Sequence, residues 1–236
     1  MSGLPTDPDL ELLSKYRDAD GPLSERLEAF ATAHRRRFPA YSDAVDKLVV
    51  RLKEADGWKD APNVGEEMPP FLLPNEAGRL VALQSLLADG PVAIMFHRGH
   101  WCPYCRMNLR AIARENDAIG AAGGRVIVIQ PDRQQFAEKM QADANAQMPI
   151  LTDMDNGYAL ALNLAIWVGP DITKMYARSG YDLPRYQGND AWIVPIPATF
   201  VVGRDGKVAA RFIDPDFRKR MELDDLLAAF KDAGRA

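Results

Sequence analysis

The chain contains two cysteines, Cys102 and Cys105, which lie three residues apart in the sequence Cys-Pro-Tyr-Cys. A short apolar run over residues 91–96 precedes them and is typical of a buried strand. Pro103 suits the first position of a helix, because its missing N–H would be unpaired there and its φ is already helical. The sequence therefore predicts a dithiol where a buried strand passes into a helix, an arrangement typical of thiol redox sites.

Composition indicates the kind of protein that carries this dithiol. The chain has 236 residues, of which 47% are hydrophobic, and its net charge of −4 comes from both signs spread along the sequence. We therefore expect neither nucleic acid nor a membrane surface as a partner. Residues 1–9 lack the basic and apolar regions of a secretory signal, and no run approaches the ~20 apolar residues of a membrane span. A cytoplasmic protein is expected, and in that compartment disulfides are rarely structural.

The first 60 residues have the pattern of helices. One helix is expected after Ser24, and a second has Ser42 as its N-cap and apolar residues at i, i+3, i+4 and i+7, namely Val45, Leu48, Val49 and Leu52. The proline-rich stretch 61–74 then enters a compact region. We predict a helical N-terminal extension over residues 1–60 and one domain over residues 61–236.

Strand-like and helical segments alternate in this second region. Apolar runs at 91–96, 125–129 and 149–151 alternate with helical patterns at 103–119, 133–145 and 155–164. A hairpin follows at 198–213 around an Asp-Gly turn, and a last helix begins near Leu223. This order predicts an α/β fold whose central sheet is mostly parallel, with the hairpin as its antiparallel edge.

The segment 165–196 is expected to be irregular, and it is rich in aromatic residues. These side chains either line a substrate cleft or cover the edge of the sheet, and the sequence does not choose between the two; they are Trp167, Tyr176, Tyr181, Tyr186 and Trp192.

The predicted helix start assigns a role to each cysteine. Free N–H groups and the helix dipole favour a thiolate on Cys102, so this residue is expected to be the attacking nucleophile. Cys105, one turn later and less exposed, is expected to resolve the product as an intramolecular disulfide. Arg98, His97 and His100 bring positive charge or proton carriers nearby, although the histidines are equally compatible with structural loop contacts. Trp101 is expected to shield the dithiol.

Pro197 is the second informative position. It precedes a buried strand, where a proline removes a donor of the sheet, and a cis Ile196–Pro197 bond is one reason for its presence there.

A metal site is an alternative for the same residues. His97, His100, Cys102 and Cys105 are all potential ligands, but a segment this short spans a strand end and a helix start and wraps a tetrahedron poorly. We expect no metal and no cofactor. The alternative function is a non-catalytic redox-sensing or metal-holding module whose N-terminal helices bind the partner.

Several segments resemble the peroxiredoxin-like proteins of the alkyl hydroperoxide reductase/thiol-specific antioxidant family. They are GEEMPPFLLPNEAGRLVAL, PVAIMFHRGHWCPYCRMNL and AWIVPIPATFVVGRDGKV, within a resemblance that covers roughly residues 62–232, and the helical extension is similar too. The resemblance implies a thioredoxin-like fold and a dithiol that cycles through a disulfide at the expense of a thiol reductant. It also implies a cis-proline, Pro197, facing the two sulfurs. The dithiol motif itself is also that of glutaredoxins, whose flanking sequences differ.

Two positions depart from the family pattern. Gly99 stands where the family has a Thr or Ser, and Pro197 lies in the neighbourhood of the family's late arginine, for which Arg98 is a possible substitute. Both departures favour a disulfide as the oxidising substrate, whereas the family resemblance favours a hydroperoxide, so both versions stay open. A homodimer is compatible with the sequence.

Overall fold

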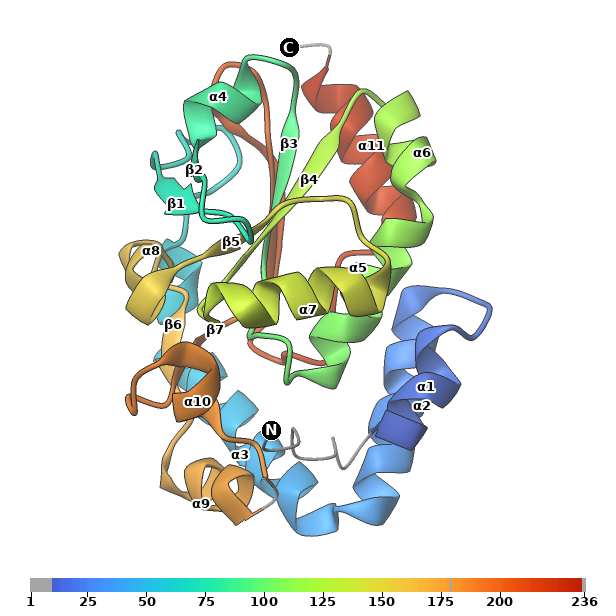
Figure 1. Ribbon diagram of the computed structural model, residues 1–236, viewed down its shortest axis with the longest axis vertical. Helices are drawn as coiled ribbons and strands as arrows, with labels where there is room; N and C mark the ends of the chain where they lie inside the picture. Colours follow the sequence, from blue (N-terminus) through green and yellow to red (C-terminus); the bar gives the residue numbers. More distant parts are fainter. Residues whose placement is uncertain (1–9, 179, 235–236) are drawn as a thin grey trace.

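The computed structural model describes residues 10–178 and 180–234, and a five-stranded mixed sheet lies at its centre (Figure 1). The strand order is β5-β4-β3-β8-β9, with bounds Ile150–Thr152, Arg125–Gln130, Val92–Phe96, Ala198–Val202 and Val208–Ile213. Strands β3, β4 and β5 are parallel, and the β8–β9 hairpin joins β3 antiparallel, which confirms the predicted sheet.

Alternating side chains of β3 supply two separate hydrophobic clusters, one on each face of the sheet. Ala93 and Met95 face the first cluster, whereas Val92, Ile94 and Phe96 face the second. The first cluster also receives side chains from α5 (Pro103–Arg114), α6 (Asn116–Ala121), α7 (Gln134–Ala144) and α11 (Leu223–Ala233), and it continues into the N-terminal helices and the segment 165–196. The second face packs against α4 (Leu83–Leu87) and α8 (Gly157–Ala161). Both cysteines belong to the first cluster.

Short elements complete this part of the chain. The 3₁₀ helix η1 (Gly57–Asp60) precedes a small hairpin of β1 (Leu72–Pro74) and β2 (Leu80–Ala82), and η2 (Met154–Asn156) precedes α8. The single helix predicted over 103–119 is divided into α5 and α6 by Glu115, whose φ of −107° and ψ of 16° are not helical.

The N-terminal extension forms three helices that curve around one end of the sheet (Figure 1). They are α1 (Leu10–Arg17), α2 (Leu23–Arg37) and α3 (Pro39–Ala55). Phe30 of α2 is fully buried and packs edge-on against Tyr104 of α5, with 5.1 Å between ring centroids. The N-cap prediction for Ser42 is wrong, because Pro39 at the first helical position starts α3 earlier and leaves Ser42 buried inside the helix.

The aromatic-rich segment is ordered and not irregular as predicted. It forms β6 (Ala165–Trp167), α9 (Pro170–Arg178), α10 (Leu183–Gln187) and β7 (Ile193–Pro195), with β6 and β7 paired antiparallel. The short elements lack the length over which a period is detectable in sequence. Helix α9 contacts α3, so the segment and the N-terminal extension meet on the side of the molecule where α5 begins.

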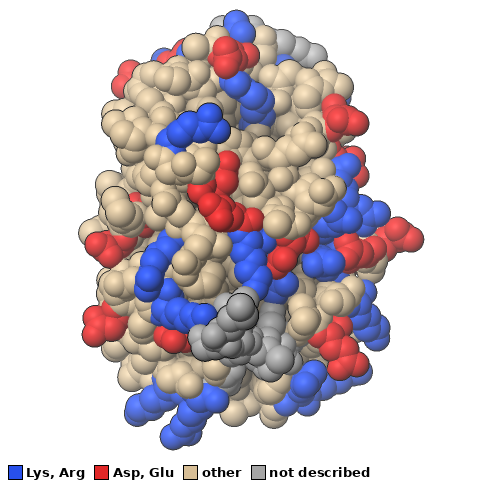
Figure 2. Space-filling view, in the orientation of Figure 1, with Lys and Arg blue, Asp and Glu red and all other residues tan. Residues whose placement is uncertain are grey.

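Within the described residues, none of the helices is long and apolar enough to cross a bilayer. Figure 2 shows basic and acidic side chains intermixed over one face of the molecule.

The packing of α2 predicts a large cost for removing Phe30. Because this ring is fully buried against Tyr104 and Tyr16, Phe30→Ala should lower the free energy of unfolding by about 3–5 kcal/mol. Urea unfolding measures this, with Val50→Ala on the exposed side of α3 as a control that should change it by less than about 0.5 kcal/mol. Equal stability of the two variants would show that the extension is not part of the cooperative core.

Candidate active site

The dithiol lies where β3 passes into α5. Cys102 occupies the N-cap position of α5 with extended backbone, and Pro103 is the first helical residue, as predicted. The Cys102 carbonyl accepts hydrogen bonds from the N–H groups of Cys105 and Arg106, both at 3.1 Å, which closes the first turn. The two cysteines are free thiols, and their side chains are hydrogen-bonded to one another. This geometry supports the formation of a disulfide within one helical turn.

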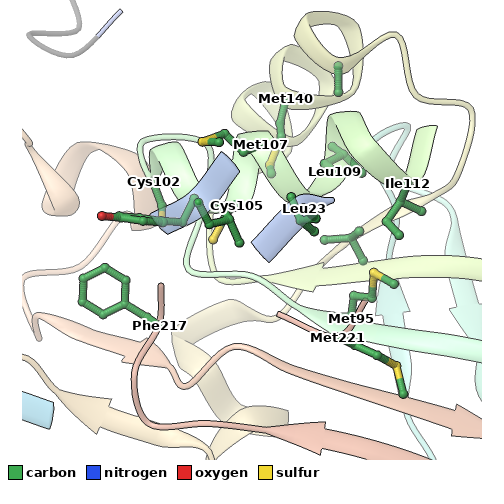
Figure 3. Packing of buried hydrophobic residues seen from close by; sticks show 14 of the residues in the cluster. Leu23, Met95, Cys102, Cys105, Met107, Leu109, Ile112, Met140, Phe217 and Met221 are labelled. Atoms are coloured by element: carbon green, nitrogen blue, oxygen red, sulfur yellow. The ribbon is translucent and has the colours of Figure 1, made fainter. Parts of the chain in front are cut away.

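Both thiols are buried, but only one of them faces a cavity. Cys102 is 1% exposed and Cys105 is fully buried. Cys102 lines a cavity of about 180 Å³, which Cys105 does not reach. In Figure 3, Cys102 and Phe217 lie toward one end of the hydrophobic cluster, and Met221 lies toward the other. Access from outside is therefore to Cys102.

Positive charge converges on the inner sulfur. The Cys105 Sγ accepts the backbone N–H of Arg98 at 3.4 Å and a guanidinium N–H of Arg220 at 3.3 Å. Burial raises the pKa of Cys105, but the hydrogen bond with Cys102, the charge of Arg220 and the Arg98 N–H outweigh burial and hold this pKa well below its usual range. Burial and the neighbouring Cys105 raise the pKa of Cys102. These contacts favour a thiolate on Cys105 over one on Cys102, whereas the helix N-terminus alone led us to expect it on Cys102.

Arg98 is itself buried, and its side chain lines the cavity. Its guanidinium donates to the Tyr176 hydroxyl at 3.0 Å and lies between two aromatic rings, 3.9 Å from the centroid of Phe217 and 4.8 Å from that of Trp101. Neither Arg98 nor Arg220 has a carboxylate within ion-pair distance among residues 10–178 and 180–234. Buried cations without acidic partners are costly, so the cysteine pair is the natural site of compensating charge.

The two histidines of the loop are held away from the cavity. The His97 Nε2 is hydrogen-bonded to the Asn108 side chain at 3.0 Å, and the His100 Nε2 to Asp143 at 2.7 Å. Burial lowers the pKa of both imidazoles, which favours their neutral forms. No group of three or more His, Cys, Asp or Glu side chains in the described part of the chain is arranged to hold a metal ion. The four potential ligands of the loop therefore do not converge as a metal site.

A buried acid fills the space beside Gly99. A Cβ at position 99 would overlap the Asp132 carboxyl and the Trp101 indole nitrogen, and the backbone φ of +132° there also favours glycine. One Asp132 oxygen accepts the His100 N–H at 2.7 Å, and the other has no hydrogen-bond partner among the described residues. Burial raises the pKa of Asp132 from 3.8 to about 8, which favours the protonated carboxyl below that pH.

Pro197 does not have the predicted cis bond. All peptide bonds of the described residues are trans. Ala198 begins β8 opposite Phe96, so Pro197 lies just before the strand, where its missing N–H costs the sheet no hydrogen bond. It is buried near the end of β3, but it does not line the cavity beside Cys102.

The aromatic segment contributes to the site in part. Tyr176 and Tyr181 line the cavity and pack edge-on against Trp101, whereas Trp167 is half-exposed and lies elsewhere. Trp101 is 4% exposed and lines the cavity beside Cys102, and its shielding of the dithiol stays a prediction. Sequence reasoning missed Arg220 and Asp132, since each meets the dithiol loop through contacts between residues distant in sequence.

The fold and this buried dithiol define a thiol-based oxidoreductase of the thioredoxin-like class. Residues 64–211 match the AhpC/TSA family, and the chain belongs to that family. It is 23% identical over 164 residues to the thiol-disulfide oxidoreductase ResA of Bacillus thuringiensis (strain Al Hakam), covering 70% of this chain and 78% of ResA.

Solved structures share the fold at low identity. The peroxidoxin BcpB of Mycobacterium tuberculosis aligns with a TM-score of 0.56 and 20% identity, over 72% of this chain and 97% of BcpB. Peroxiredoxin 6 of Arenicola marina aligns with a TM-score of 0.55 and 15% identity, over 71% of each chain. The thioredoxin-like fold implied by the sequence resemblance is thus confirmed.

The contact between Arg220 and Cys105 predicts a change in thiol ionisation. Replacing Arg220 with Met removes the charge that lowers the pKa of Cys105, so the thiolate should form at higher pH than in the wild type. The ultraviolet absorbance of the thiolate, followed against pH in the reduced protein, measures this. Arg218→Met is a matched control, because Arg218 pairs with Asp216 in the same loop and has no contact with the sulfur. Identical titrations for both variants would refute the role of Arg220.

Asp132 predicts a specific pH dependence of stability. Its folded pKa lies above its unfolded pKa, so the folded state holds a proton that the unfolded state releases between pH 3.8 and about 8. The free energy of unfolding of the wild type should therefore fall relative to that of Asp132→Asn as pH rises through this window. The expected change is on the order of a few kcal/mol, since one pKa unit corresponds to about 1.36 kcal/mol.

Urea unfolding at several pH values tests this expectation. Asp60→Asn, which changes an exposed carboxyl, should run parallel to the wild type throughout. A constant difference between Asp132→Asn and the wild type would mean that Asp132 ionises normally in the folded protein.

Proposed function

We propose that this protein reduces a small hydroperoxide at Cys102 and closes a Cys102–Cys105 disulfide, which an external dithiol then reduces. The observation that carries this proposal is the access to Cys102, which is 1% exposed and reached through a cavity of about 180 Å³. A hydroperoxide needs to bring only its terminal oxygen to the sulfur. A protein disulfide brings two sulfurs and their flanking chains, for which this cavity has no room.

The first half of the reaction uses the hydrogen bond between the two sulfurs. The proton of Cys102 passes to Cys105, and the resulting Cys102 thiolate attacks the terminal oxygen of ROOH. The O–O bond breaks, Cys102 becomes a sulfenic acid, and the leaving alkoxide takes a proton from solvent to give ROH. The Arg98 guanidinium lines the same cavity as Cys102, and we expect it to donate a hydrogen bond to the leaving oxygen, with Tyr176 beside it.

The second half of the reaction converts the two cysteines to an uncharged disulfide. The Cys105 sulfur attacks the sulfenic sulfur of Cys102, the S–O bond breaks, and the departing hydroxide combines with the Cys105 proton to form water. The Cys102–Cys105 bond then holds the two oxidising equivalents. An external dithiol then gives two electrons and two protons and leaves as a disulfide; one proton stays on Cys102, and the other returns to solvent in place of the proton that the alkoxide took, so Cys105 is again a thiolate. Arg220 stabilises the Cys105 thiolate and so favours the reduced pair.

Stopped-flow oxidation of the reduced protein tests the proposal with three oxidants: hydrogen peroxide, an organic hydroperoxide and a folded protein carrying a surface disulfide. The wild type should consume a hydroperoxide far faster than free cysteine does, and it should react slowly with the protein disulfide. Cys102→Ser should abolish the fast phase. Cys105→Ser should retain one rapid turnover and accumulate a sulfenic acid that mass spectrometry detects.

The outcomes separate the parts of the proposal. If Cys102→Ser reacts as fast as the wild type, the assignment of the nucleophile is wrong. If hydroperoxides react no faster than with free cysteine while the protein disulfide is reduced rapidly, the protein is a disulfide reductase and not a peroxidase.

A further inference from the structure

Aromatic rings from separate parts of the chain wall the cavity beside Cys102. Tyr41 comes from the N-terminal extension, Trp101 from the dithiol loop, Tyr176 from α9 and Phe217 from the segment between β9 and α11. Phe217 lies toward the same end of the core as Cys102 (Figure 3). Such walls favour an apolar, preferably flat occupant, which offers ring contacts to several of them.

The volume of the cavity limits the size of that occupant. An apolar cavity of ~150 Å³ holds one benzene molecule, so about 180 Å³ accommodates one ring with a short substituent. A long alkyl chain exceeds this space. Hydrogen peroxide, in contrast, fills little of it and gains no contact with the rings.

One side of the cavity is polar. The Arg98 guanidinium donates to the Tyr176 hydroxyl at 3.0 Å, and this hydroxyl lies 2.9 Å from that of Tyr41. Burial raises the pKa of Tyr41, so its hydroxyl keeps its proton. These hydrogen bonds start from the Arg98 guanidinium, a buried cation that has no carboxylate partner among the described residues. They therefore suit an oxygen at one end of an otherwise apolar molecule.

The extension closes this cavity. Tyr41 of α3 and Phe38, which precedes α3, form part of its wall together with His34 of α2. The hydroxyl contact between Tyr41 and Tyr176 joins the extension to α9 across the cavity. The dimensions of the site thus depend on residues that the N-terminal helices supply.

We propose that this cavity is a substrate site for compact arylalkyl hydroperoxides, in which the ring lies among the aromatic walls and the peroxide oxygens lie between Cys102 and the Arg98–Tyr176–Tyr41 chain. Tyr41 is a specificity residue, through which the N-terminal extension selects substrate size. This inference rests on the proposed peroxidase function, and the reaction is the one written above, with an arylalkyl alcohol as ROH.

Steady-state kinetics with cumene hydroperoxide and hydrogen peroxide give the first test. The wild type should show the higher kcat/KM for cumene hydroperoxide. Tyr41→Ala removes one wall, so it should lower this kcat/KM by about 10-fold or more while hydrogen peroxide changes much less. Tyr16→Ala removes a partly buried ring from α1 of the same extension, outside the cavity, and should leave the ratio of the two values unchanged.

A binding measurement separates this inference from the peroxidase proposal. The alcohol 2-phenylpropan-2-ol, which cannot oxidise the thiols, should slow alkylation of Cys102 by iodoacetamide in the wild type and in Tyr16→Ala, but not in Tyr41→Ala. A long-chain fatty alcohol should give no protection. Protection by the aryl alcohol without any hydroperoxide reduction would support the cavity as an aryl-ligand site and refute the peroxidase. No protection, or the same protection in Tyr41→Ala as in Tyr16→Ala, would overturn the inference.

Discussion

Two buried guanidinium groups beside two buried thiols set the conditions for the rest of this structure. Arg98 and Arg220 are 1% and 8% exposed, and their hydrogen bonds go to the Cys105 sulfur, to Tyr176 and to backbone carbonyls. Such charges are tolerated in a protein interior only when they are compensated. A thiolate on the cysteine pair compensates one of them, and the rings of Trp101 and Phe217 cover the other. Burial of the dithiol and its ionisation are therefore two aspects of one arrangement.

The N-terminal extension is the element that makes this burial possible. Phe30 packs on Tyr104, within the first turn of the dithiol helix, and the hydroxyl of Tyr41 is hydrogen-bonded to that of Tyr176, which also lines the cavity. Rings that fill a core at van der Waals contact exclude water, which strengthens every electrostatic interaction that they enclose. The same helices that complete the hydrophobic core thus set both the polarity around Cys102 and the size of molecule that reaches it.

The sequence patterns predicted those structural features that depend on residues close together in the chain. The apolar run before the loop, Pro103 at the helix start and the Asp-Gly turn of the hairpin all act locally, and they gave the strand–dithiol–helix unit and the β8–β9 pair. The errors have local causes as well. Ser42 lies inside α3 because Pro39 starts the helix earlier, with Phe38 as its N-cap, and the Ile196–Pro197 bond is trans and not cis as predicted.

The contacts that tune the site were not predictable in this way. Arg220 meets Cys105 across 115 positions, and Tyr41 meets Tyr176 across 135. Neither pair belongs to a periodic pattern, because Arg220 lies in an irregular segment and the two tyrosines come from separate helices. Only the packing of the extension and α9 against the sheet brings these groups together, and single-sequence reasoning has no access to that packing.

Access from the cavity and stabilisation of negative charge are usually combined in one reactive cysteine, but here they belong to two different sulfurs. Cys102 lines the cavity and Cys105 has the charge stabilisation, so the reaction that we propose requires a proton to move between them.

The surroundings of Gly99 explain why this position has no side chain, although the resemblance to the family implies a hydroxyl there. The space that a side chain would need is filled by the Asp132 carboxyl and the Trp101 indole nitrogen. Among the described residues, neither Asp132 Oδ1 nor Trp101 Nε1 has a hydrogen-bond partner. The loop therefore keeps two polar atoms with hydrogen-bonding capacity beside Gly99.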